Sequence, residues 1–243
     1  MISTPVSIAV VVADVALALL LIAGITYAAR RERRPAVLWL GGGAVAAWFV
    51  LSLVLARQGA FETTAQTTMP PAIAPAIVIP TVLGCALLAL ASVRQTIARL
   101  PLHWLVGVQI YRVGGGLFLI AWLQGDLPAE FALPAGIGDV LVGIAAPFVA
   151  ISLARDGAQR AWPRVLAWAT LGIFDLVVAV TFGLLTAPST VQQLALDEPN
   201  TAITSYPLVL IPTFLVPASI ILHVYVIARL VRPPQAARRP RVA

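Results

Sequence analysis

Lysine is absent from the 243-residue sequence, and cysteine occurs once, at Cys85. Without lysine, a retinal Schiff base cannot form, and a single cysteine excludes an internal disulfide. Charged residues make up only 11% of the chain, whereas hydrophobic residues make up 60%. This composition excludes an ordinary soluble domain and is typical of a membrane protein.

Long apolar runs fill most of the chain. A helix that crosses a bilayer needs about 20 mostly apolar residues, and these runs are continuously apolar rather than alternating, which indicates helices. We therefore predict an all-α bundle of seven transmembrane helices at about 6–29, 36–56, 72–93, 102–123, 136–154, 165–187 and 207–230. Residues 1–232 would form this one domain, and residues 233–243 a basic, disordered tail.

The arginines predict the orientation of this bundle. Fourteen of the 16 basic residues fall in four segments that the seven helices would place on one side, at 30–34, 94–99, 155–164 and 229–241. The positive-inside rule makes that side cytoplasmic. We expect a bacterial cytoplasmic membrane, an outside N-terminus and a cytoplasmic C-terminus. The basic side would contact anionic lipid, and we expect no nucleic-acid partner.

Arg112 lies near the middle of the run 102–123. A guanidinium stays charged, and placing it at the bilayer centre costs about 2.5–3.5 kcal/mol on insertion scales. It therefore needs carboxylates, carbonyls or water as partners. The runs supply Asp14, Asp139 and Asp175 at comparable depth.

If all three acids were ionised, their negative charge would exceed the single positive charge of Arg112. At least one should be protonated, reach water or bind a cation, as in proton relays and ion-coupled carriers. Two alternatives remain open. Arg112 and Asp175 could form a purely structural pair, and Asp139, near the outer end of its run, could be simply interfacial.

The residues around Arg112 favour close packing. Gln109, Arg112, Gly115 and Gly116 share one helix face, and small residues let another backbone approach. The segment is not a phosphate loop, because no strand precedes it and the loop lysine is missing.

Two runs carry matching Pro-Thr patterns that could form kinks. An interior proline removes a helical hydrogen bond, and a nearby threonine can help the freed carbonyl. Proline-interrupted helices at corresponding positions in two halves indicate a transporter's central site, although prolines can also merely shape a bundle. The candidate gating residues are Pro75, Pro80, Thr81, Pro207, Pro212, Thr213 and Pro217.

These patterns also suggest a duplication. The spacing from Asp14 to Arg30 recurs from Asp139 to Arg155. Such matches predict two parallel three-helix repeats joined by the helix at 102–123, unless apolar, proline-rich helices match by chance. The topology is similar to that of the sugar-efflux family, whose Pro-Gln motif is missing from these helices.

The two histidines, His103 and His223, lie toward the same side of the predicted bundle. Bis-histidine haem ligation is conceivable, and ordinary hydrogen-bonded roles are the alternative. Since metal-site spacings and hydrolase motifs are missing from the sequence, we expect no cofactor and no enzyme activity.

A further resemblance involves the central segments of the chain. They read Gln-x-Tyr-Arg-x-x-Gly at 109–115, Gly-x-Leu-Pro at 125–128 and Phe-Ala-Leu-Pro-Ala-Gly-Ile-Gly-Asp at 131–139. This pattern resembles a family of uncharacterised bacterial polytopic membrane proteins. The resemblance implies an integral membrane protein and no activity.

Three functional hypotheses follow. The first is a proton-coupled carrier of a small solute or ion, with Arg112, Asp175, Asp14, Asp139 and Gln109 at its site. The second is a non-transporting sensor or accessory subunit, working as a homo-oligomer or with a membrane partner. The third is a haem-binding redox protein that uses His103 and His223.

Overall fold

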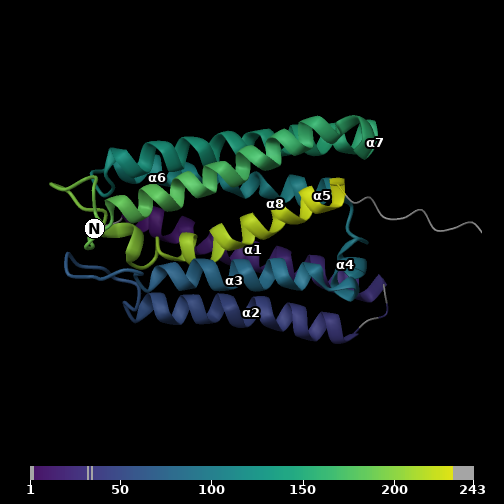
Figure 1. Ribbon diagram of the computed structural model, residues 1–243, viewed down its shortest axis with the longest axis horizontal. Helices are drawn as coiled ribbons and strands as arrows, with labels where there is room; N and C mark the ends of the chain where they lie inside the picture. The colour runs from purple at the N-terminus through teal and green to yellow at the C-terminus, as the bar shows by residue number, and fades with distance from the viewer. Residues whose placement is uncertain (1–2, 32, 34, 232–243) are drawn as a thin grey trace, which may run out of the picture.

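The computed structural model describes residues 3–31, 33 and 35–231, so the predicted basic tail lies outside the described residues. All elements of the described part are helical, and they run roughly alongside one another (Figure 1). The elements are α1 Thr4–Arg31, α2 Pro35–Arg57, α3 Ile73–Ala89, α4 Ala91–Ile97, α5 Leu102–Gly107, η1 Val108–Gly115, α6 Gly116–Leu123, α7 Ala129–Thr186, η2 Ala202–Thr204, η3 Ile211–Leu215 and α8 Val216–Val231.

Five helical stretches of the described chain are long and apolar enough to cross a membrane, or six if the bent pair of α3 and α4 is one span. Their outward faces are apolar. Leu19, Trp39, Phe148 and Phe174 each expose more than half of their surface. Exposed apolar side chains in such numbers suit contact with lipid, so the fold is compatible with a membrane location.

Helix α7 consists of two helical segments that meet at a kink. Gly157 has φ +75° and ψ 164° within it, a conformation that glycine adopts without a Cβ clash. Two helical segments, one on each side of Gly157, therefore fold back beside each other (Figure 1). The sequence analysis placed a loop at 155–164, and the structure corrects this to a one-residue break.

Three other predicted boundaries also change. The run 72–93 is a helix pair that bends by 90° between α3 and α4. Helix α7 begins at Ala129, so the expected outer loop 124–135 is shorter than predicted. Pro207 lies in a turn before the last helix rather than within it.

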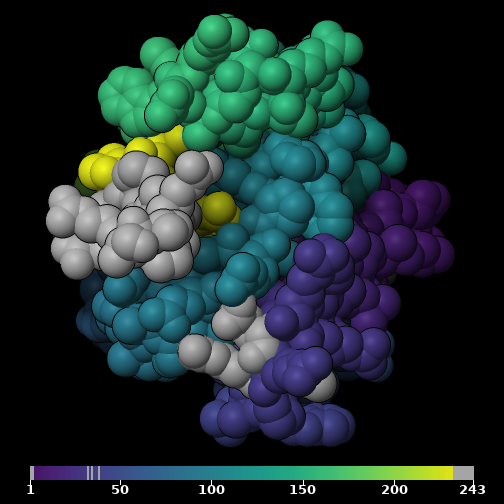
Figure 2. Space-filling model, turned by 90° about the vertical axis from the view of Figure 1, so that its right-hand side faces the viewer, coloured from purple at the N-terminus to yellow at the C-terminus, as the bar shows by residue number. Residues whose placement is uncertain are grey.

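Apart from Arg57 and Arg112, the arginines of the described residues gather at one end of the bundle. The ends of α1 and α8, helix α4 and the turn of α7 meet there, opposite the loops that follow α2, α6 and α7 (Figure 1). Figure 2 looks onto this end, with the turn of α7 at the top and helix α2 toward the bottom. The elements are therefore arranged as the arginine pattern predicted.

A polar layer divides the interior into two apolar clusters. In α7 before Gly157, Ala135 belongs to the first cluster and Val142 to the second, with Asp139 between them. After Gly157, Ala169 belongs to the second and Leu176 to the first, with Gly172 and Asp175 between. Arg112 lies in the same interval of its own helix, between Val106 and Phe118.

Candidate functional site

The backbone around Arg112 forms a 3-10 helix, η1, between the α-helical segments α5 and α6. Its buried residues are Gln109, Arg112 and Gly115. Side chains three apart are eclipsed in a 3-10 helix, so these residues form one row facing the interior. The predicted shared face is confirmed for them, with the 3-10 repeat in place of the α-helical one.

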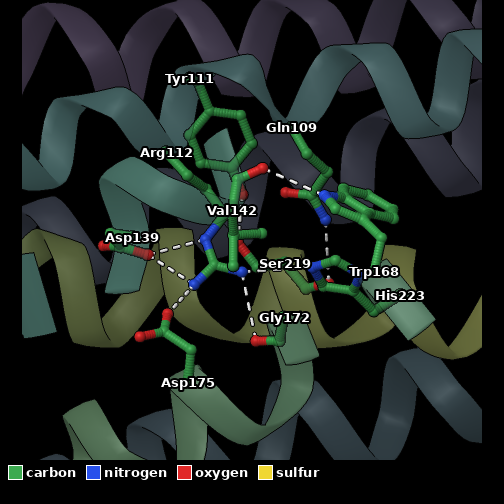
Figure 3. Close-up of polar contacts among 10 residues, drawn as sticks. All are labelled: Gln109, Tyr111, Arg112, Asp139, Val142, Trp168, Gly172, Asp175, Ser219 and His223. Atoms are coloured by element: carbon green, nitrogen blue, oxygen red, sulfur yellow. Dashed lines mark hydrogen bonds and ion pairs between the residues drawn. The ribbon is translucent and has the colours of Figure 1, made fainter. Parts of the chain in front are cut away.

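Arg112 binds two acids of α7, Asp139 and Asp175. Its Nε donates to Asp139 Oδ1 at 2.7 Å, and its Nη2 lies 2.6 Å from the same oxygen. Nη2 also donates to Asp175 Oδ2. Nη1 donates to the backbone carbonyl of Gly172 at 3.2 Å, and the two acids lie together on one side of the guanidinium (Figure 3). The alternative of a simply interfacial Asp139 is therefore wrong.

His223 is the remaining contact of the guanidinium. Its Nε2 lies 3.2 Å from Arg112 Nη1, and its ring packs on Trp168 with centroids 4.7 Å apart. A guanidinium only donates, so Nε2 accepts and the imidazole is neutral, with its hydrogen on Nδ1. The Nε2 that a haem iron would take is thus already bound. His103 is half-buried beside Trp104.

Glycines in α7 make the room for this cluster. A Cβ on Gly138 would overlap the carboxylate of Asp175, and one on Gly172 would overlap the imidazole of His223. A Cβ on Gly143 would come within 2.5 Å of the Val113 nitrogen. These three glycines were not predicted from the sequence. Their positions within four residues of Asp139 or Asp175 were an available signal.

The charge of the cluster is unbalanced. Arg112 supplies one positive charge against two carboxylates, and the neutral His223 adds none. Arg112 is only 3% exposed and Asp175 8%, so little water screens the excess negative charge. A proton or a bound cation would balance it.

Asp14 lies apart from this ion cluster. It is fully buried, and neither carboxylate oxygen has a hydrogen-bond partner in the described part of the chain. The Tyr111 hydroxyl is hydrogen-bonded to Ser219 Oγ. The structure thus brings Asp139 and Asp175, but not Asp14, into contact with Arg112.

Gln109 supports α8 rather than the ion cluster. Its Nε2 donates to the carbonyl of Ser219 at 3.4 Å, and its Oε1 has no partner among the described residues. Gln109 is fully buried, so this amide oxygen remains an acceptor inside the polar layer.

A cavity extends to the ion cluster from the end of the bundle that carries the loops after α2, α6 and α7, here called the loop end. Thr63, Ser189 and Thr204 line its outer part, and Asp139 is the one charged residue of its described lining. A second cavity adjoins Arg112 and Tyr111 and shares Asp139 with the first. Asp139 is therefore the cluster residue that both cavities reach.

The predicted kink residues have different roles in the structure. Pro75 lies in the first turn of α3, whereas Pro80 is inside it. Pro212 lies at the start of the π-helical turn η3, and Pro217 in the first turn of α8.

The threonines bond one position beyond the carbonyls that the prolines free. Thr81 donates to the carbonyl of Ile77 at 2.7 Å, and Thr213 donates to that of Val209 at 2.8 Å. The carbonyl left free by Pro217 belongs to Thr213, and Trp48 of α2 donates its indole N–H to it at 3.1 Å. A neighbouring helix, which sequence reasoning did not identify, thus provides this partner.

Residues 83–231 match the family described as Domain of unknown function (DUF8737). The chain belongs to this family. The DUF8737 match contains Arg112 and all of its side-chain partners, whereas Asp14 lies outside it. It also covers 109–139, the stretch that carried the resemblance to an uncharacterised family. No curated protein and no solved structure matches the chain.

Proposed function

We propose that the protein is an integral membrane carrier that couples movement of a small solute or ion to protons at the Arg112 cluster. The observation that carries this proposal is the cavity that reaches Asp139 from the loop end. A carrier needs a central site that opens to one side and a charge that can change. The unbalanced carboxylates beside Arg112 provide the second requirement.

The proposed topology has seven spans in a bacterial cytoplasmic membrane, with the arginine-rich end in the cytoplasm. The two segments of α7 would each be one span, and α3 with α4 another. Two three-helix repeats would flank the Arg112 helix. The matching hydroxyl bonds of Thr81 and Thr213, each following a proline, support this repeat. In it, Pro80 and Pro212 would mark the gates.

Proton flux in liposomes tests the carrier proposal. Purified protein is reconstituted with an internal pH-sensitive dye, and a membrane potential is imposed with and without candidate solutes. We expect dye responses in wild type that are lost in the Arg112→Gln, Asp175→Asn double variant. This pair removes charges of both signs together, so the variant has the better prospect of folding. Unchanged flux in folded double variant would refute the proposal.

One observation favours a second candidate, a non-transporting sensor or accessory subunit. All three guanidinium nitrogens of Arg112 already have partners, which suits a cluster that only holds helices together. In this case wild-type liposomes show no flux, and a membrane partner or second copy copurifies with the chain.

A further inference from the structure

The cavity beside Asp139 has a charged inner end and apolar walls. Arg112 uses Oδ1 of Asp139 for both of its contacts with that residue. The Asp139 side chain remains 15% exposed, whereas that of Arg112 is 1% exposed. An occupant of the cavity therefore meets the carboxylate, and the guanidinium lies behind it.

The walls are apolar along most of the cavity. Phe118, Phe131, Leu176 and Val180 line it, and the two phenylalanine rings pack edge to face with centroids 5.1 Å apart. These walls favour an occupant with an apolar body rather than a hydrated ion.

The charge selects the head group of that occupant. An anion would face an uncompensated carboxylate, and a neutral molecule would leave the excess negative charge of the cluster in place. A single positive charge would balance it and could donate a charge-assisted hydrogen bond to Asp139. The hydroxyls of Thr63, Ser189 and Thr204 line the opposite end of the cavity, where the molecule would enter.

We propose that this cavity binds a hydrophobic monocation, an amine with an apolar body whose head group contacts Asp139. The inference rests on the proposed carrier function and names its substrate class. It differs from simple proton relay because the apolar walls recognise the rest of the molecule.

Three probes with one apolar body test the charge selection. Phenylbutylammonium, phenylbutanol and phenylbutyrate differ chiefly in head-group charge. Binding to the full chain in lipid nanodiscs is measured by equilibrium dialysis, with empty nanodiscs subtracted. We expect saturable binding of the ammonium at least about tenfold tighter than that of the alcohol, and no saturable binding of the butyrate. Equal affinity for ammonium and alcohol, or tighter binding of butyrate, would overturn the proposal.

A cavity-filling variant tests the location without disturbing the ion pair. Ala179 lines the cavity, and Ala179→Phe should weaken ammonium binding by about tenfold or more, since the ring occupies the space of the probe. Val177 on the same helix is 55% exposed, so Val177→Phe is the matched control and should bind as wild type. Unchanged affinity in folded Ala179→Phe would place the probe elsewhere and refute the site.

Flux separates this inference from the proposed function. If the ammonium binds but neither protons nor the probe are transported, the proposed binding site stands and the carrier function is refuted. If proton flux depends on the Arg112 cluster but the ammonium does not bind, the carrier function stands and the proposed binding site is refuted.

Discussion

The carboxylate of Asp175 packs directly against the backbone of Gly138, so that a Cβ on Gly138 would overlap Asp175 Oδ1. This contact joins the two segments of α7 at the level of Arg112. Asp175 can therefore reach Arg112 because Gly138, on the facing segment of α7, has no side chain.

Gly138→Ala should therefore destabilise the bundle. The added methyl must displace Asp175 or separate the two helical segments, and we expect a loss of about 1–3 kcal/mol, seen as a lower Tm in detergent. Gly114 has nothing within 4 Å of its Cβ position, so Gly114→Ala is the control and should melt at or above the wild-type temperature. Equal Tm values for the two variants would contradict the packing described.

Arg112→Gln should cost more than the glycine change. Removing the guanidinium leaves Asp139 and Asp175 buried without their cation, a loss of about 3–5 kcal/mol. Neutralising Asp175 as well, in the double variant with Asp175→Asn, should recover part of the Tm. Arg57 makes an exposed hydrogen bond to Tyr206, and Arg57→Gln should change Tm little. A double variant no more stable than Arg112→Gln would argue against charge pairing as the cause.

Asp14→Asn separates stability from transport. Because both carboxylate oxygens are buried without partners, the substitution breaks no hydrogen bond, and we expect an unchanged or higher Tm. If Asp14 carries protons in the proposed cycle, proton flux in liposomes should fall by about tenfold or more. Wild-type flux in the folded variant would remove Asp14 from the pathway.

Trp48→Phe tests the support of the last helix. The substitution keeps an aromatic ring but removes the donor to the Thr213 carbonyl, which should cost about 1 kcal/mol or more. Trp39 on the same helix is 76% exposed, so Trp39→Phe should leave Tm unchanged. Similar small effects of both changes would mean that the Thr213 carbonyl finds another donor.

Cysteine labelling tests the proposed orientation. In a Cys85→Ala background, Ser189→Cys should react with a membrane-impermeant maleimide on intact cells, because the loop after α7 would lie outside. Arg160→Cys, at the arginine-rich end, should react only after the membrane is opened. Labelling in the reverse order would invert the topology.

The sequence predicts the elements of this fold better than their rotation. The run 102–123 matches the outer bounds of α5, η1 and α6, because length and hydropathy set where an apolar helix can lie. Hydropathy carries no information on which face a helix turns toward its neighbours. Asp175 was therefore named as a possible partner of Arg112, but Asp139 had an interfacial alternative, and His223 was considered for haem rather than as an Arg112 partner.

Local backbone geometry is the second feature that the sequence does not predict. The single-residue turn at Gly157 and the bend between α3 and α4 arise from specific dihedral angles, which apolar composition does not encode. The early start of α7 followed Pro128, a residue that can open a helix as readily as extend a loop.

The polar layer between the two apolar clusters also fixes how far each helix is shifted along its axis relative to its neighbours. Aliphatic side chains gain little from choosing one another over lipid tails, so apolar helices can slide along their axes at small cost. A shift of one turn, about 5.4 Å, would separate Arg112 from Asp139 and Asp175. The alignment of the helices along the axis of the bundle is thus set by charge at a single level.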